Sequence, residues 1–235
     1  MIDIHAHVLP GIDDGARTLT DSADLVRELA KSGVTDIIVT PHYVSETNYV
    51  SSKEKNLELL EELKRVIRDE DLGVEVFLGN EIYIDRGIEE LMELGVISTM
   101  ANSKYVLVEL PLSGEYPNYQ DIMSDLIASG YRVILAHPER YEIAQKDFGV
   151  LEELYKMGVL FQCNLCSIVG KYGRSAKKVL KKLLENRMVF AFGSDIHHCH
   201  GEDYWLSAQK KMKKYCDEKE LNRLLVVNPR KIIGK

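Results

Sequence analysis

The 235-residue sequence has little cysteine, no long apolar segment and no excess of positive charge. Four cysteines are too few for a disulfide scaffold of this length. No apolar run approaches the ~20 residues that a membrane span requires, and the strand-like Ile2–Ile4 leaves no room for a signal peptide. The 30 basic and 37 acidic residues give a net charge of −7, which disfavours nucleic acid as a partner. We therefore expect a soluble, cytoplasmic protein without membrane insertion.

The cysteines also argue against one catalytic mechanism. Cysteine-dependent phosphatases carry an arginine six residues after the nucleophile, whereas the corresponding positions here hold Val169, Tyr172, Trp205 and Asn222. Cys163 and Cys166 form an isolated Cys-x-x-Cys pair, which is a weak zinc signal without a second pair. We interpret Cys163 as a small apolar residue of a buried strand. Cys166 follows that strand, and two interpretations stay open for it: an inert buried thiol, or an oxidation-sensitive group at the rim of a site.

Short apolar runs alternate with amphipathic segments along the whole chain, without a linker or a low-complexity stretch. The predicted strands are Ile2–Ile4, Thr35–Thr40, Val74–Leu78, Tyr105–Leu110, Arg132–Ala136, Val159–Asn164 and Val189–Phe192. The predicted helices run from near Thr20 or Asp21 to Gly33, from a Ser51-x-x-Glu54 capping box through Ile67, over Gln120–Ser129, Val150–Met157 and Ala176–Asn186, and beyond Asp203. Apolar strands alternating with helices indicate a parallel sheet covered on both faces. Seven such units favour a barrel, regular or irregular, rather than an open doubly wound sheet, and we expect a single domain that comprises residues 1–235.

Residues that can bind metal ions occur where the predicted strands end, and this is the edge at which parallel α/β folds place their sites. In chain order they are His5 and His7, Asp13 and Asp14, His42, Glu81, Glu109, His137, and Asp195 with His197. The sixth strand contributes no such residue. The two remaining histidines of the chain, His198 and His200, lie in the last of these loops. Each of these residues alone could be an ordinary surface group or a helix cap, but together they predict a polynuclear metal site. Imidazole and carboxylate ligands suit Mn²⁺, Fe²⁺ or Zn²⁺, and ten candidate side chains exceed the needs of one tetrahedral ion. We expect two or three ions.

The strings around these residues resemble the PHP (polymerase and histidinol phosphatase) superfamily. They include Asp-Ile-His-Ala-His at residues 3–7, Thr-Pro-His at 40–42, Gly-Asn-Glu at 79–81, Glu-Leu-Pro at 109–111 and Gly-Ser-Asp-Ile-His at 193–197. Two further strings, Leu-Pro-Gly-Ile-Asp-Asp-Gly at residues 9–15 and His-Pro-Glu-Arg-Tyr at residues 137–141, are similar to the CpsB/CapC branch. That branch comprises manganese-dependent tyrosine-protein phosphatases of bacterial capsule and exopolysaccharide operons. The resemblance runs from Met1 to about His197.

The resemblance implies a distorted seven-stranded (β/α)7 TIM-like barrel with C-terminal helices and a site for three ions, for which it implies manganese. The implied ligand sets are His5, His7, Glu81 and Asp195 for one ion, Glu81, Glu109 and His137 for a second, and Asp14, His42 and His197 for the third. Arg140 is implied to hold the phosphate. The implied substrate is phosphotyrosine in the C-terminal tail of a bacterial tyrosine kinase, hydrolysed by a hydroxide that bridges two ions.

The sequence departs from the family pattern after His197. Family members commonly carry an arginine five residues past this histidine, whereas Glu202 stands here. His198 or His200 could substitute at the substrate rim, and Arg17 is a second candidate for contact with the phosphate. Oligomeric state does not follow from the sequence.

Several other functions remain as alternatives. A PHP phosphatase for a small phosphomonoester, such as histidinol phosphate, would use the same ligands. A metal-dependent amidohydrolase would have no reason to keep Arg140. A catalytically silent metal-binding regulator would fit the missing second arginine, although the ligand set is complete. Nuclease activity is disfavoured by the acidic balance and the lack of a basic stripe.

Overall fold

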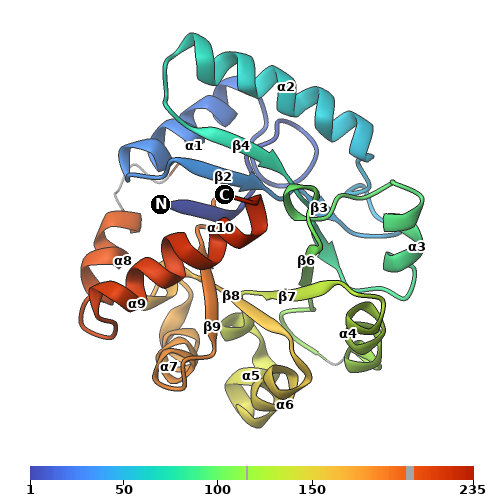
Figure 1. Ribbon diagram of the computed structural model, residues 1–235, viewed down its shortest axis with the longest axis vertical. Coiled ribbons are helices and arrows are strands. Elements are labelled where there is room, and N and C mark those ends of the chain that lie inside the picture. Colours follow the sequence, from blue (N-terminus) through green and yellow to red (C-terminus); the bar gives the residue numbers. More distant parts are fainter. Residues whose placement is uncertain (115, 200–203) are drawn as a thin grey trace.

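The computed structural model describes residues 1–114, 116–199 and 204–235, and its strands form a twisted ring surrounded by helices (Figure 1). The strands are β1 (Ile2–Ala6), β2 (Asp36–Val39), β3 (His42–Tyr43), β4 (Glu75–Leu78), β5 (Glu81–Tyr83), β6 (Tyr105–Glu109), β7 (Arg132–Ala136), β8 (Leu160–Asn164) and β9 (Val189–Gly193). All their pairings are parallel, with the orders β1-β2-β4 and β3-β5-β6-β7-β8-β9. The prediction of a distorted parallel α/β barrel is confirmed.

Two of the seven predicted strands are interrupted, and this interruption distorts the barrel. The second continues past Thr40-Pro41 as β3, and the third continues past Gly79-Asn80 as β5. Proline has no N–H for the strand ladder. A side chain at Gly79 would lie 3.2 Å from Ile38 and 3.3 Å from the backbone of Met100. The Asn80 side chain bridges the break, because it donates to Pro41 O and accepts from Ser98 N. As a result His42 and Glu81 lie on strands of their own and not in loops.

The ring closes between β9 and β1 through backbone contacts just beyond the strand ends. Asp195 N donates to His5 O at 2.8 Å, and His7 N donates to Ile196 O at 3.0 Å. The buried carboxylate of Asp3 reinforces this closure by accepting from Ser194 N. Closure by these residues holds the ends of the first and last strands together, where the candidate metal ligands stand.

The helices follow the strands around the outside of the barrel. They are α1 (Leu19–Lys31), α2 (Lys53–Asp69), α3 (Ile88–Glu93), α4 (Tyr119–Ala128), α5 (Glu142–Lys146), α6 (Gly149–Met157), α7 (Gly173–Glu185), α8 (Tyr204–Met212), α9 (Glu218–Asn222) and α10 (Asn228–Ile233). Among the described helices, none combines the length and hydrophobicity that a membrane span requires.

The predicted helix starts differ from the observed ones by one to three residues, and the largest difference is at α7, which begins at Gly173 and not at Ala176. The first helix begins at Leu19, because Thr18 is its N-cap and forms a capping box with Asp21. The second begins at Lys53, and its N-cap is Ser52 in place of Ser51. The Ser51 hydroxyl is already engaged, since it donates to the Asn56 side chain. Two adjacent serines offered alternative caps, and this side-chain contact determines which one is used.

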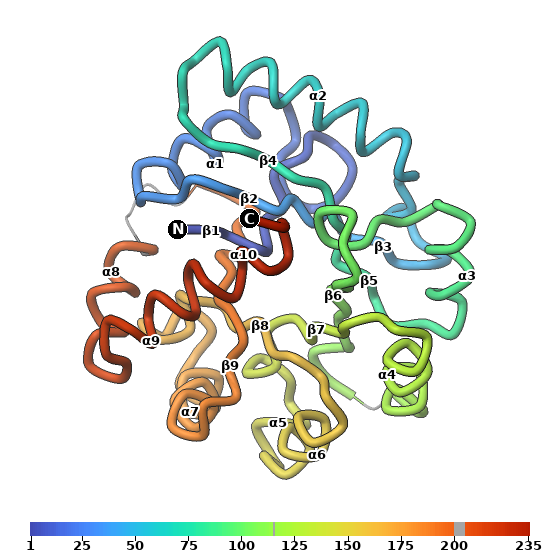
Figure 2. Tube along the Cα trace, viewed as in Figure 1, coloured from blue at the N-terminus to red at the C-terminus, as the bar shows by residue number. Residues whose placement is uncertain are grey.

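The apolar core has two parts. One lies between the strands and the surrounding helices, and the other fills the barrel with side chains such as Ile4, Ile38, Leu107 and Ile134. Ile232 of α10 joins this inner cluster, and α10 lies across the ring in Figures 1 and 2. Lys235 contacts Asp36 at the start of β2, so α10 covers the end of the barrel at which the strands begin. The opposite end stays open for a site.

Candidate metal centre

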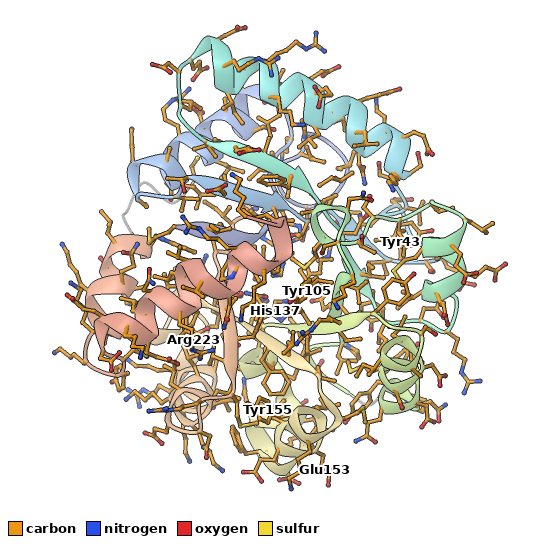
Figure 3. The ribbon with its side chains drawn as sticks, viewed as in Figure 1. Tyr43, Tyr105, His137, Glu153, Tyr155 and Arg223 are labelled. Carbon is orange, nitrogen blue, oxygen red and sulfur yellow. The ribbon has the colours of Figure 1, made fainter. Side chains whose placement is uncertain are left out.

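The ends of the strands bring the predicted ligands from distant parts of the chain into one cluster. His137, which follows β7, lies near the centre of the ring in Figure 3, whereas Glu153 and Tyr155 lie on the outer helix α6. His137 has a left-handed backbone with φ of 30°, so the chain turns sharply at the strand end. The nine predicted ligands meet here: His5, His7, Asp14, His42, Glu81, Glu109, His137, Asp195 and His197.

Glu81 of β5 lies at the middle of the cluster and is fully buried. Its Oε2 atom is 3.1 Å from Nε2 of both His5 and His7, and 3.2 Å from Nδ1 of His42. Its Oε1 atom is 3.0 Å from Nε2 of His137. Among the described residues, no hydrogen bond satisfies Oε2. One carboxylate oxygen thus meets three imidazoles without a hydrogen bond, which is how ligands of an ion are arranged around it.

The His5 and His7 rings are held so that their lone pairs face each other. Nδ1 of His5 lies 2.8 Å from the Gln162 side-chain oxygen, and Nδ1 of His7 lies 2.9 Å from the Asp13 carboxylate. Both partners are acceptors, so both Nδ1 atoms carry the proton and both Nε2 atoms are unprotonated in the neutral rings. These Nε2 atoms are 3.0 Å apart and adjacent to Glu81. A cation between them would relieve this clustering of electron-rich atoms.

A second set of ligands lies toward the solvent. Asp14 Oδ1 is 3.3 Å from Nε2 of His197 and 3.5 Å from Nε2 of His42. The His197 ring stacks on the His7 ring with centroids 4.0 Å apart. The hydrogen bond from His197 lowers the pKa of Asp14 to about 2, so this half-exposed carboxyl is ionised at neutral pH.

Burial and the neighbouring charges shift the pKa values of the carboxyl groups in the cluster. Burial, aided by the carboxylates of Glu81 and Asp195, raises the pKa of Glu109 to about 9. The neighbouring His5 and His42 hold the pKa of Glu81 well below its ordinary value, although burial opposes this shift. Without cations, Glu109 thus keeps its proton at neutral pH. Such an environment is suited to bound divalent ions, which replace that proton with positive charge.

The strand that contributes no predicted ligand instead orients the ligands of its neighbours. The Gln162 amide of β8 accepts from His5, as described above, and from His137 N, and it donates to Asn164 at 3.0 Å. Asn164 in turn donates to Asp195 Oδ2 at 2.7 Å. The signal for this chain of hydrogen bonds was present in the sequence as two buried amides in a strand otherwise read as apolar.

Asp13 has a supporting role that its position beside Asp14 did not reveal. Its Oδ2 atom accepts from the His7 ring and from His42 N, and its Oδ1 atom accepts from Gly15 N. A side chain at Gly15 would lie 2.2 Å from His7 O, so only glycine lets the loop fold back over this histidine. The loop after β1 is therefore built to hold His7 and Asp14 together.

Arg140 lies at the edge of the cluster in the short helix Pro138–Arg140. Its guanidinium donates to Asp195 Oδ2 at 2.6 Å and lies over the ring of Tyr172, with 4.6 Å between its carbon and the ring centroid. The side chain is about one fifth exposed, so it can still meet a ligand from the solvent. The cluster opens into a cavity that we call the main cavity. Among the described residues, Arg140 is the only arginine that lines it.

The ligand cluster opens into a cavity of about 510 Å³. Its charged lining is Asp14, His42, Glu81, Glu109, His137, Arg140, Asp195 and His197. Arg17 and His198, predicted as substrate contacts, are not among the residues that line it; they line a second cavity of about 260 Å³ that shares His197. The loop after β1 carries Arg17 past the site to the start of α1, which explains the difference. His200 and Glu202 lie outside the described residues.

The cysteines fit the inert interpretation. Cys163 of β8 is fully buried, as expected of an apolar strand residue. Cys166 is 5% exposed, and burial raises its pKa to about 11. It therefore has very little thiolate at neutral pH and is poorly suited to a redox role.

Within the part of the chain that the structure describes, three groups of ligand atoms are compact enough to hold an ion, with all atoms in a group within 4.8 Å of one another. They are His5, His7 and Glu81; His42, Glu81 and Glu109; and His7, Asp14, His42 and His197. The first group contains three of the four ligands that the family resemblance implies for one ion, without Asp195, and the third contains the whole implied set for another ion together with His7. In the second, His42 takes the implied place of His137, although His137 Nε2 is also close to Glu81 at 3.0 Å and to Glu109 at 3.4 Å.

We expect chelator-treated protein to lose stability as the pH rises. Burial raises the pKa of Asp3 to about 6 and that of Glu109 to about 9, both above their ordinary values. Such carboxyls contribute stability below about pH 4, near their unfolded pKa, and lose it as the pH rises through the folded pKa. The melting temperature should therefore fall from about pH 5 to about pH 9, and Glu109→Gln should flatten the upper part of this slope. A melting temperature that rises across this range would contradict the raised pKa values of Asp3 and Glu109.

Comparisons with known proteins agree with this geometry. A family model described as capsular polysaccharide synthesis, CpsB/CapC, matches residues 1–234. A putative tyrosine-protein phosphatase CapC of Staphylococcus aureus is 32% identical over 94% of this chain and 87% of its own length. The tyrosine-protein phosphatase YwqE of Bacillus subtilis is 31% identical over 84% of this chain and 78% of its own.

Solved structures match the fold as well. A chain from crystal structures of YwqE of Bacillus subtilis and CpsB of Streptococcus pneumoniae, described as unique metal-dependent tyrosine phosphatases, has a TM-score of 0.91. The two sequences are 27% identical, and the match covers 100% of this chain and 94% of the crystallised chain. A β-aspartyl dipeptidase of Fervidobacterium islandicum, at 14% identity and a TM-score of 0.61, shares the fold alone over 99% of this chain and 72% of its own. The strand-end ligand cluster, the family match over nearly every residue and these relatives agree: the chain belongs to the CpsB/CapC family.

Proposed function

We propose that this protein is a metal-dependent phosphatase that hydrolyses phosphotyrosine on a protein. The observation that carries the proposal is the convergence of three imidazoles on the unsatisfied Oε2 of Glu81, beside an arginine at the rim of the same cavity. Relatives named tyrosine-protein phosphatases support the same conclusion.

The residues of the cluster suit two or three divalent ions, for which Mn²⁺ is our first candidate and Fe²⁺ or Zn²⁺ are alternatives. Glu81 would bridge two ions, because each of its oxygens faces a different histidine group. The proposed ligands are His5, His7, Asp14, His42, Glu81, Glu109, His137, Asp195 and His197. When bound, the ions supply charge that offsets the repulsion of a phosphate dianion, and they acidify water for nucleophilic attack.

The protein's own residues bind and orient the phosphate ester. Arg140 presents a planar fork of N–H donors to the nonbridging phosphate oxygens. Its present partner Asp195 and the ring of Tyr172 fix the guanidinium at the cavity edge. A tyrosinate leaving group has a pKa of about 10, far below that of an alkyl alcohol, so the site needs no strong general acid.

We propose a phosphotyrosine-bearing protein as the partner, with the C-terminal tail of a bacterial tyrosine kinase of polysaccharide export as its specific form. We also propose a cytoplasmic location. The four free cysteines support a reducing compartment. The family's description, capsular polysaccharide synthesis, supports the pathway.

Phosphate release from a phosphotyrosyl peptide tests the proposal, with Mn²⁺ present, after removal of metal by a chelator, and after its return. Histidinol phosphate serves as the comparison substrate. We expect release from the peptide that stops on chelation and returns with metal. Release from histidinol phosphate alone would indicate a phosphatase of another PHP branch. Metal binding without release from either would indicate a silent regulator.

We expect Gln162→Leu to weaken metal binding without unfolding the protein. The substitution removes the acceptor that holds Nδ1 of His5 and the link to Asn164, so the His5 ring can rotate and change tautomer. Loss of such a supporting hydrogen bond costs about 10- to 100-fold in metal affinity. Competition with a chromophoric chelator measures the affinity, and Gln120→Leu on α4 is the control with the same chemical change. An unchanged metal affinity would contradict this role.

Thiol reagents should leave the activity intact at neutral pH. Cys163 and Cys166 are buried, and the pKa values of Cys166, Cys199 and Cys216 are each raised to about 11, mainly by burial. Alkylation therefore finds little thiolate, and none of the four thiols lines the main cavity among the described residues. Phosphate release after iodoacetamide treatment measures this. Rapid inactivation that substrate prevents would point to a cysteine mechanism instead.

A further inference from the structure

The main cavity has an apolar wall that the chemistry of phosphate binding does not use. Tyr49, Tyr83 and Leu112 line the cavity together with the charged cluster and Arg140. They come from three separate segments: the loop after β3, the strand β5 and the loop after β6. Leu112 is 39% exposed and lines the cavity together with the two tyrosines, so the three side chains form one apolar surface that a ligand in the cavity can contact. We call these three side chains the apolar wall.

Tyr49 is held in place from two sides. Its carbonyl accepts from Val44 N at 2.7 Å, which closes a tight loop, and its own N–H donates to the Thr47 hydroxyl. Its ring stacks nearly parallel on the His42 ring, with 16° between the planes and 5.9 Å between the centroids. The Tyr49 ring therefore lies beside a proposed metal ligand, and both residues line the cavity.

The other two members of the apolar wall are also braced. The Tyr83 ring meets Tyr116 edge to face, with centroids 6.3 Å apart. The carbonyl of Leu112 accepts from Glu142 N at the start of α5, the helix that follows Arg140 by two residues. This hydrogen bond connects Leu112 of the apolar wall to the chain segment that carries Arg140. A ligand whose phosphate lies at the charged cluster must extend outward between the apolar wall and the guanidinium.

We propose that Tyr49, Tyr83 and Leu112 bind the aromatic ring of the substrate and so select aryl phosphates. This inference rests on the proposed function, because it assigns the ring site next to the proposed phosphate site. A planar ring gains from offset or edge-to-face contact with tyrosines and from burial against a leucine. An alkyl phosphate such as phosphoserine has no ring to fill this space, so its peptide backbone would have to approach the charged cluster itself.

The test separates the ring from leaving-group chemistry by comparing benzyl phosphate with n-propyl phosphate. Both release an alkoxide, and only the first carries a ring. We expect the Mn²⁺-loaded enzyme to favour benzyl phosphate about tenfold in kcat/KM. Tyr49→Ala and Leu112→Ala should each reduce this preference at least about threefold, whereas Tyr49→Phe should keep it. Tyr155→Ala, on the outer helix α6, is the matched control. Tyr49 stacks on the ring of His42, whereas Leu112 has no ring, so the Leu112 variant remains informative if Tyr49→Ala disturbs His42.

Binding of benzylphosphonate and n-propylphosphonate, which are not hydrolysed, gives a second measurement on the metal-loaded protein. Calorimetry should show the same preference for the ring and the same loss in the two alanine variants. Ester hydrolysis with no ring preference, or with a preference unchanged in both variants, would overturn the inference while leaving the proposed function intact. A ring preference among the phosphonates with no release of phosphate from a phosphotyrosyl peptide would overturn the proposed function and leave the ring site standing.

Discussion

We expect Glu81→Gln to lower phosphatase activity about a thousandfold or more. The carboxylate is fully buried and places one oxygen 3.1 Å from Nε2 of both His5 and His7 and the other 3.0 Å from Nε2 of His137. An amide would place N–H donors where a cation should sit, and it would remove the bridging charge. Loss of a metal contribution of several kcal/mol to the transition state corresponds to about three decades in rate or more.

Metal content shows whether that loss has the stated cause. Mass spectrometry should find fewer ions per chain in Glu81→Gln, and the melting temperature should no longer rise when Mn²⁺ is added. Glu62→Gln, on the exposed face of α2, is the control with the same chemical change. Near-normal turnover with a normal metal content in Glu81→Gln would contradict the central position of this carboxylate.

Arg140→Ala should lower kcat/KM for a phosphotyrosyl peptide by about a hundredfold, because the planar donor fork stabilises charge on the phosphoryl oxygens. Arg140→Lys should recover only part of the loss, since an ammonium cannot bind two oxygens side by side. The main cavity holds no second arginine among the described residues to replace it.

The distinguishing control is again metal content. Arg140 also contacts Asp195, so a drop in bound metal would mean that the loss arises from the metal site and not from phosphate binding. Arg132→Ala is the matched control, because it removes an arginine at the start of β7, whereas Arg140 lies beyond the other end of that strand. Activity of Arg140→Ala within twofold of the unchanged protein would contradict its proposed contact with phosphate.

The sequence predicted the barrel and the ligand cluster because both depend on a pattern that repeats along the chain. Parallel strands all end at one edge, so a histidine or acid after each strand must converge with the others. His137 and Asp195 are separated by 58 positions, yet they belong to one cluster for this reason. Pro41 and Gly79, at which two predicted strands are interrupted, can be recognised in the sequence. The short strands β3 and β5 that follow them cannot, because strands of this length show no periodicity of their own.

Other features depend on contacts that no local pattern encodes. Gln162 and Asn164 stand out in the sequence as two amides in an apolar strand, but their partners, His5 and Asp195, are set by tertiary contacts that the sequence does not show. The apolar wall joins Tyr49 and Leu112, which only the folded loops bring to one cavity. Arg17 follows the ligand loop closely in sequence but lines a different cavity, because the loop folds back before the first helix starts.

The most direct test of the account is phosphate release from a phosphotyrosyl peptide, measured in the same samples as the number of Mn²⁺ ions bound per chain. A polynuclear site predicts little turnover with one ion and full turnover only when two or three are bound, because the charge of the ester is offset by several cations together. Full turnover with a single ion bound, or full loading without any release, would contradict it.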